Sequence, residues 1–127
     1  MENIIEMSPK LTSNYNYILV ELSTGMDYWE IMEAISKLFS MPASKNKNEI
    51  WTFGSAQMKM SYADLYEIKD FAVKLCPKDT ESTKTAIVAE SGIQQCLATL
   101  YSDICKDLPR EIRVFSDFNS AKEWTIT

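Results

Sequence analysis

The residue types that most often carry catalysis are scarce in this chain. Histidine is absent from all 127 residues, which removes the commonest general base and the commonest metal ligand. The cysteines, Cys76, Cys96 and Cys105, are odd in number and form no C-x-x-C pair, so we interpret them as free thiols in a reducing compartment. No P-loop and no G-x-G-x-x-G motif occurs. We therefore predict a protein that is not an enzyme and that holds no metal and no cofactor.

Carboxylates are the remaining candidates for proton transfer. Glu30 and Glu33, and likewise Asp64 and Glu67, lie three residues apart on predicted helices, and paired carboxylates can act as acid and base. No histidine, lysine or glycine-rich loop lies beside either pair to complete a site. We interpret both pairs as solvated faces of amphipathic helices.

Two serines are candidates for phosphorylation or partner contact. Ser61 begins a predicted helix and is followed by Asp64 three residues later, which is the spacing of an N-cap. A phosphate at this position would also be favoured by the helix dipole, and an arginine of a partner could bind it. Ser55 follows Gly54 in a predicted loop, where it is free to face a partner.

Aromatic and methionine side chains suggest an apolar pocket. Trp51, Phe53, Met60 and Tyr62 are the candidate lining residues. Large aromatic residues more often fill a core, and methionine fills cores as well as adaptable binding surfaces. An apolar cavity between the second predicted helix and the sheet would favour the pocket.

The elements that would position these residues alternate along the chain. Strands are predicted at 3–7, 15–22, 49–53, 83–89 and 112–115, the first two as an antiparallel hairpin with a turn at residues 12–14. Helices are predicted between Asp27 and Pro42, Ser61 and Pro77, Ser91 and Pro109, and from Asp117 to the end. The order β-β-α-β-α-β-α-β-α predicts one α/β domain over residues 1–127, with a mixed five-stranded sheet and four helices.

The composition of the chain disfavours nucleic acid as a partner and disfavours a segment that spans a membrane. The chain has 18 acidic and 13 basic residues, a net charge of −5, and this balance disfavours nucleic acid. No apolar run is long enough to span a bilayer, and the N-terminal residues lack the basic start and apolar core of a signal peptide. We therefore expect a cytoplasmic protein.

The C-terminal half carries a resemblance to a known family. Its strand, helix, strand and Asp-capped helix resemble the small bacterial SpoIIAA-like family of STAS and SEC14-like domains. The residues that carry this resemblance are Ala86-Ile87-Val88-Ala89, Leu100-Tyr101, Leu108-Pro109, Ile112-Arg113-Val114-Phe115, Asp117 and Ala121-Lys122-Glu123-Trp124. Most of them are packing and capping residues, so they indicate the fold more specifically than the function.

The resemblance implies a relation to anti-sigma-factor antagonists and to lipid-carrying SEC14-like modules. In the antagonists a serine near the helix that follows the middle strand is phosphorylated, and an aspartate often precedes it. The matching region here is Thr52-Phe53-Gly54-Ser55, followed by Ser61, and no aspartate stands at the strand end.

Two functional hypotheses follow. The first is a non-enzymatic regulatory domain that binds a protein partner, with a homodimer as one form of that interaction. The second is a module that binds a small apolar ligand or lipid.

Overall fold

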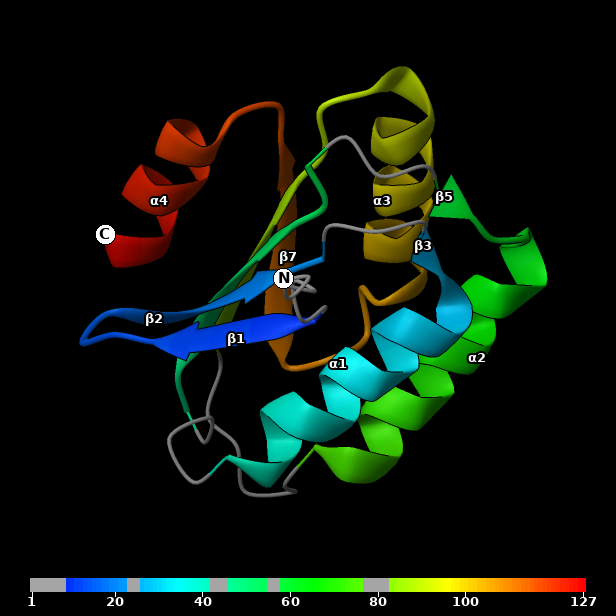
Figure 1. Cartoon of the computed structure of the whole chain (residues 1–127), viewed down its shortest axis with the longest axis horizontal. Coiled ribbons are helices and arrows are strands. Elements are labelled where there is room, and N and C mark those ends of the chain that lie inside the picture. Colours follow the sequence, from blue (N-terminus) through cyan, green and yellow to red (C-terminus); the bar gives the residue numbers. More distant parts are fainter. Residues whose placement is uncertain (1–8, 23–25, 42–45, 55–57, 77–82) are drawn as a thin grey trace, which may run out of the picture.

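The fold is an α/β sheet with helices on both faces (Figure 1). The computed structural model describes residues 9–22, 26–41, 46–54, 58–76 and 83–127. The strands are β1 (Lys10–Ser13), β2 (Tyr17–Glu21), β3 (Met26–Asp27), β4 (Asn48–Thr52), β5 (Met58–Lys59), β6 (Thr83–Val88) and β7 (Arg110–Phe115). The helices are α1 (Tyr28–Ser40), α2 (Tyr62–Leu75), α3 (Gly92–Ile104) and α4 (Phe118–Ile126).

The main sheet has five strands in the order β1-β2-β4-β6-β7. β1 and β2 pair antiparallel, and every other neighbouring pair is parallel. The predicted mixed five-stranded α/β sheet is therefore confirmed. β3 and β5 form a separate parallel pair, and α1 and α2 begin just after these two short strands.

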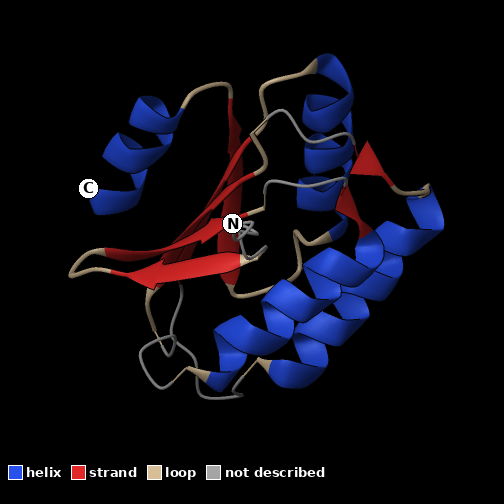
Figure 2. Ribbon diagram, in the orientation of Figure 1, coloured by secondary structure: helices blue, strands red, loops and turns tan. Residues whose placement is uncertain are grey.

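Side chains alternate between the two faces of the sheet, and each face has its own apolar cluster. α1, α2 and α3 cover one face, where Val20, Trp51 and Ile87 of the sheet are buried. α4 covers the other face, where Ile50 and Ala86 pack against helix residues. Figure 2 shows α4 alone on its side of the strands, with the three longer helices opposite.

α4 is also tied to the sheet by polar contacts at its C-terminal end. The Asn48 side-chain amide donates to the Thr125 carbonyl at 2.9 Å, and Lys84 Nζ donates to the Trp124 carbonyl at 3.0 Å. Lys84 Nζ also lies 5.3 Å from the centre of the Trp124 ring, within cation–π range.

Every predicted helix start is confirmed by an N-cap. The side chains of Asp27, Ser91 and Asp117 each accept a hydrogen bond from the backbone N–H three residues later. Ser61 and Asp64 form a capping box: Ser61 Oγ accepts from Asp64 N at 3.2 Å, and an Asp64 carboxylate oxygen accepts from Ser61 N at 2.9 Å.

The structure corrects the N-terminal hairpin. Thr12 and Ser13, predicted as a turn, belong to β1 and pair with β2. The turn follows instead at Asn14, whose side-chain oxygen accepts from the backbone N–H of Tyr17 at 2.9 Å. The strand predicted at 3–7 lies outside the described residues.

The end of α3 and the start of β7 also differ from the prediction. α3 was expected to continue to Pro109, but it ends at Ile104, where Lys69 of α2 donates to the terminal carbonyl at 2.9 Å. β7 begins at Arg110 instead of Ile112, because Arg110 pairs with Thr83 of β6. Within the described ranges, every helix is too short or too polar to cross a bilayer.

The capping box gives a direct test of Ser61. Ser61→Ala is expected to lower the free energy of unfolding by about 1 kcal/mol, because Asp64 N–H loses its acceptor. Ser61→Thr keeps a hydroxyl at the same place and is the control. Urea denaturation of both variants measures the difference, and a Ser61→Ala variant as stable as Ser61→Thr would contradict the capping role.

Candidate functional site

A cavity of about 360 Å³ lies between the three-helix layer and the sheet. Its walls are mostly aliphatic and aromatic, and they come from α1, α2, α3 and the sheet. The main aliphatic side chains that the helices contribute are Ile31, Ile35, Leu38, Leu65, Ile68 and Leu97. This volume falls in the range of about 300–1,000 Å³ that is usual for small-molecule pockets, near its lower end.

The sequence-predicted pocket residues divide into two groups. Trp51, Phe53 and Met60 line the cavity. Tyr62 does not line the cavity. It lies in the first turn of α2 and is 53% exposed, and its hydroxyl oxygen lies 3.3 Å from the hydroxyl oxygen of Tyr66. Ser55 lies outside the described residues, and Ser61 is exposed at the start of α2.

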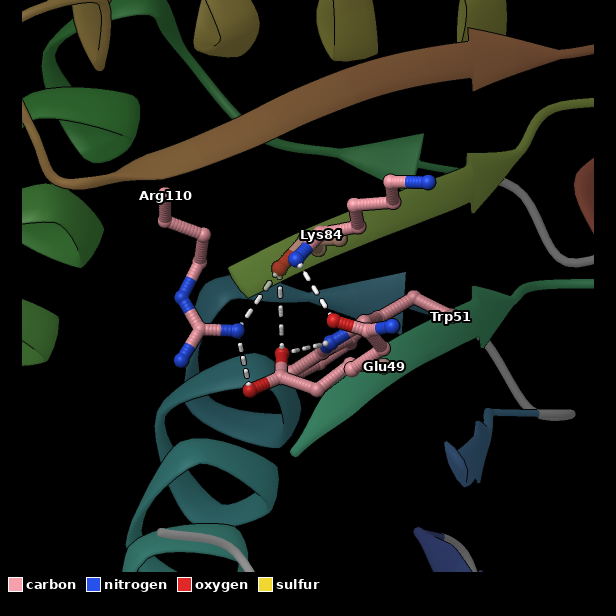
Figure 3. Close-up of polar contacts among 6 residues, drawn as sticks. Glu49, Trp51, Lys84 and Arg110 are labelled. Carbon is pink, nitrogen blue, oxygen red and sulfur yellow. Dashed lines mark hydrogen bonds and ion pairs between the residues drawn. The ribbon is translucent and has the colours of Figure 1, made fainter. Parts of the chain in front are cut away.

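A buried ion pair forms the polar end of the cavity. Arg110 Nη1 donates to a Glu49 carboxylate oxygen at 2.6 Å, and the two side chains are only 12% and 5% exposed. The second Glu49 oxygen accepts from the Trp51 indole N–H at 2.9 Å. Arg110 Nη1 also donates to the Thr85 hydroxyl at 2.8 Å, and that hydroxyl lies 3.5 Å from Glu49 (Figure 3).

Strand register brings this cluster together. Glu49 lies opposite Thr85 across the β4–β6 pair, and Arg110 lies opposite Thr83 across the β6–β7 pair. Residues two apart on a strand point to the same face, so Trp51 joins Glu49 on the helix-covered side. The cluster thus sits at the amino ends of three parallel strands.

Two polar atoms of the cluster have no hydrogen-bond partner in the described part of the chain. They are the hydroxyl oxygen of Thr83 and Nη2 of Arg110, and each exposes less than 1 Å². Both residues line the cavity. A buried donor without an acceptor costs about 1–3 kcal/mol, so a hydrogen-bonding group that reached these two atoms would be bound favourably there.

Tyr101 lines the cavity from α3. Burial, together with the neighbouring Cys105 and Glu49, raises the pKa of the Tyr101 phenol well above its ordinary value. Burial likewise raises the pKa of the Cys105 thiol. Tyr101 therefore stays a neutral hydroxyl over the physiological pH range, and Cys105 is a weak nucleophile.

The Glu49 carboxylate is held in place by its partners. Trp51, Thr85 and Arg110 together occupy both of its oxygens, an arrangement that fixes a carboxylate in one orientation. Among the described residues no three cysteine, aspartate or glutamate side chains cluster as metal ligands would. The absence of enzymatic activity stays a prediction.

Sequence reasoning missed Glu49 and Arg110 as a pair, along with the two threonines between them. The sequence pattern predicts Glu49 only as the first residue of a strand, and it places Arg110 before one. A signal did exist: Glu49, Thr83 and Thr85 are polar residues in strands that also contain the apolar residues of the core. A carboxylate that alternation places on the same face as Trp51 is buried if that face is covered, and a buried charge needs a partner.

Comparison with known proteins supports the fold. No family model and no curated protein matches the sequence. Among solved structures, the chain is similar to an uncharacterized protein of the DUF3478 family from Shewanella loihica PV-4, which has a SpoIIAA-like fold. The TM-score is 0.59 at 13% identity, and the match covers 98% of each chain.

This chain therefore has a SpoIIAA-like fold, as its C-terminal motifs indicated. At this level of identity the likeness shows the fold alone, and the function must be argued from the cavity and the cluster beside it.

The buried ion pair generates a prediction for stability. Arg110→Met is expected to lower the free energy of unfolding by about 3–5 kcal/mol, because it leaves the Glu49 carboxylate buried without its cation. Adding Glu49→Gln removes that charge while keeping an acceptor for Trp51. The double variant is expected to recover about 0.5–3 kcal/mol of the loss.

An exposed ion pair provides the matched control. Lys106 and Asp103 lie 3.3 Å apart with side chains 78% and 59% exposed, so Lys106→Met is expected to cost less than about 1 kcal/mol. Urea denaturation compares all the variants. A double variant no more stable than Arg110→Met would show that charge compensation is not what the pair contributes.

Proposed function

We propose that this protein binds a small apolar ligand in the cavity between its helix layer and its sheet. The observation that supports the proposal is the size and lining of the cavity: about 360 Å³, walled mainly by apolar side chains, with a small polar cluster at one end. Ligand pockets typically combine an apolar lining with a few polar groups that orient the ligand. This function corresponds to the SEC14-like side of the resemblance.

Packing supports the same proposal. Protein cores are packed as densely as organic crystals, and they rarely leave voids much larger than a water molecule. Two of the lining positions are alanines, Ala72 on α2 and Ala98 on α3, where larger side chains would fill the space. The short side chains therefore keep room for another molecule.

Trp51 makes binding measurable. It lines the cavity and is buried, whereas Trp29 is 70% exposed and Trp124 packs on the opposite face of the sheet. A Trp29→Phe/Trp124→Phe variant leaves Trp51 as the sole tryptophan. Its emission then reports on the cavity alone.

Filling the cavity tests the proposal. Ala98→Leu places a larger side chain into the space and is expected to weaken binding of the neutral apolar dye N-phenyl-1-naphthylamine by about tenfold or more, equivalent to about 1.4 kcal/mol. Stability should not fall, because the leucine occupies existing space. Titration of dye fluorescence, checked against Trp51 emission, measures both dissociation constants.

The control is Ala63→Leu, which adds the same atoms at an exposed position of α2. It is expected to bind the dye as the unmodified protein does. Native mass spectrometry of gently purified protein complements the titration by reporting any retained ligand. Absence of dye binding to the unmodified protein, or equal binding by Ala98→Leu, would contradict the proposal.

A protein-interaction domain is the second candidate function. Its supporting observation is the exposure of large aromatic side chains near the starts of α1 and α2: Trp29 is 70% exposed, Tyr62 53% and Tyr66 46%. Tryptophan and tyrosine are enriched in protein interfaces. A regulatory role and phosphorylation of Ser55 or Ser61 belong to this candidate and stay predictions.

A homodimer through this aromatic surface is the form that can be tested without a known partner. Trp29→Ser is expected to weaken self-association by about tenfold or more if Trp29 is an anchor, equivalent to about 1.4 kcal/mol. Sedimentation velocity over a concentration series measures the change, with Ile126→Ser as a control at an exposed apolar residue of α4. A monomer at all concentrations, or equal association by both variants, would remove the homodimer.

A further inference from the structure

The polar end of the cavity specifies the chemistry of the ligand more narrowly than its apolar walls do. Glu49 and Arg110 are the charged side chains that line it within the described residues, and they neutralise one another at 2.6 Å. Among the described residues, Thr83 Oγ1 and Arg110 Nη2 are the buried side-chain atoms of the lining that have no hydrogen-bond partner. The two atoms can therefore bind a further hydrogen-bonding atom, whereas the charges of Glu49 and Arg110 already balance.

We propose that the cavity selects an uncharged amphiphile, an apolar chain of medium length with one alcohol or carbonyl oxygen, and that Thr83 and Arg110 bind this oxygen. The inference rests on the proposed function and names the ligand class for that same cavity. An alcohol or carbonyl oxygen accepts a hydrogen bond from the guanidinium, and the Thr83 hydroxyl, whose hydrogen can rotate, serves as the second partner. Both buried groups are then satisfied.

Charge balance argues against a carboxylate ligand. The Arg110 cation is already compensated by Glu49, so a ligand carboxylate would enter a buried site as an additional negative charge beside Glu49. Burying a charge without a partner of its own is strongly unfavourable. A cationic head group would place a second positive charge beside the Arg110 guanidinium, which is unfavourable for the same reason.

Volume sets the length of the chain. One water molecule occupies about 30 Å³ in the liquid, so 360 Å³ holds on the order of a dozen groups of that size. This corresponds to a single medium-length chain and not to a two-chain lipid. 1-Decanol is thus a suitable probe, and sodium decanoate is its charged counterpart of the same length.

The experiment is a competition at neutral pH on the full chain. N-phenyl-1-naphthylamine is bound first, and its displacement by 1-decanol, decanoate and decylammonium is followed by fluorescence. 1-Decanol is expected to compete at least about tenfold better than either charged probe, equivalent to about 1.4 kcal/mol. Decanoate competing as well as 1-decanol would overturn the proposed ligand class.

Variants at Thr83 test the assigned contact. Thr83→Val keeps the shape of the side chain, removes the hydroxyl and leaves the Glu49–Arg110 pair intact. It is expected to weaken 1-decanol about threefold to tenfold, in the range of one hydrogen bond, with no change for n-decane, which carries no hydrogen-bonding group. Thr83→Ser restores a hydroxyl and should restore the affinity, whereas unchanged 1-decanol binding by Thr83→Val would remove Thr83 from the site.

These measurements distinguish a failure of the proposed function from a failure of the proposed ligand class. If the unmodified protein does not bind the dye, the proposed function fails and the ligand class fails with it. If the dye binds but decanoate competes as well as 1-decanol, the cavity is a ligand site and the uncharged class is wrong. Unfolding curves for each variant show whether it is folded, so that a loss of binding can be assigned to the site.

Discussion

The buried pair of Glu49 and Arg110 is the interaction on which the inner side of this fold depends. It links β4 to β7 across β6, and Thr85 of the strand between them contacts both partners. A carboxylate this deeply buried is tolerated only with a cation and further donors, and the Trp51 indole supplies one of those donors. The same contacts give an otherwise apolar cavity one polar end.

The location of this cluster is unusual for a parallel sheet. Ligands of open α/β sheets commonly bind beyond the carboxyl ends of the strands, whereas Glu49, Thr83 and Arg110 stand at the amino ends. The carboxyl end of β4 leads instead toward Gly54 and Ser55, the region that the antagonist resemblance associates with phosphorylation. The polar cluster and that region therefore stand at opposite ends of β4, although Phe53 and Met60, which flank the region in the sequence, line the cavity.

Much of the architecture was predictable because its signals are local. Capping residues such as Ser61 and Asp117 stand beside the helices they begin, and the apolar run of β6 marks a strand covered on both faces. The pairing of Glu49 with Arg110 was not predictable in this way, because it joins residues 61 positions apart through the register of three strands. The end of α3 likewise depends on Lys69, which comes from another helix.

The cavity was foreseen only as an alternative, since its existence depends on how closely the helices approach the sheet. Once present, it bears on the choice between the two functions. The cavity is lined mainly by apolar side chains and opens to solvent beside exposed residues such as Val73, so without a ligand part of that apolar lining stays in contact with water at a cost in stability. A protein that only presented its outer surface to a partner would gain nothing from such a space. A ligand that fills it offsets the cost and stabilises the folded state, which is why the inner face, and not the exposed aromatic surface, carries the leading proposal.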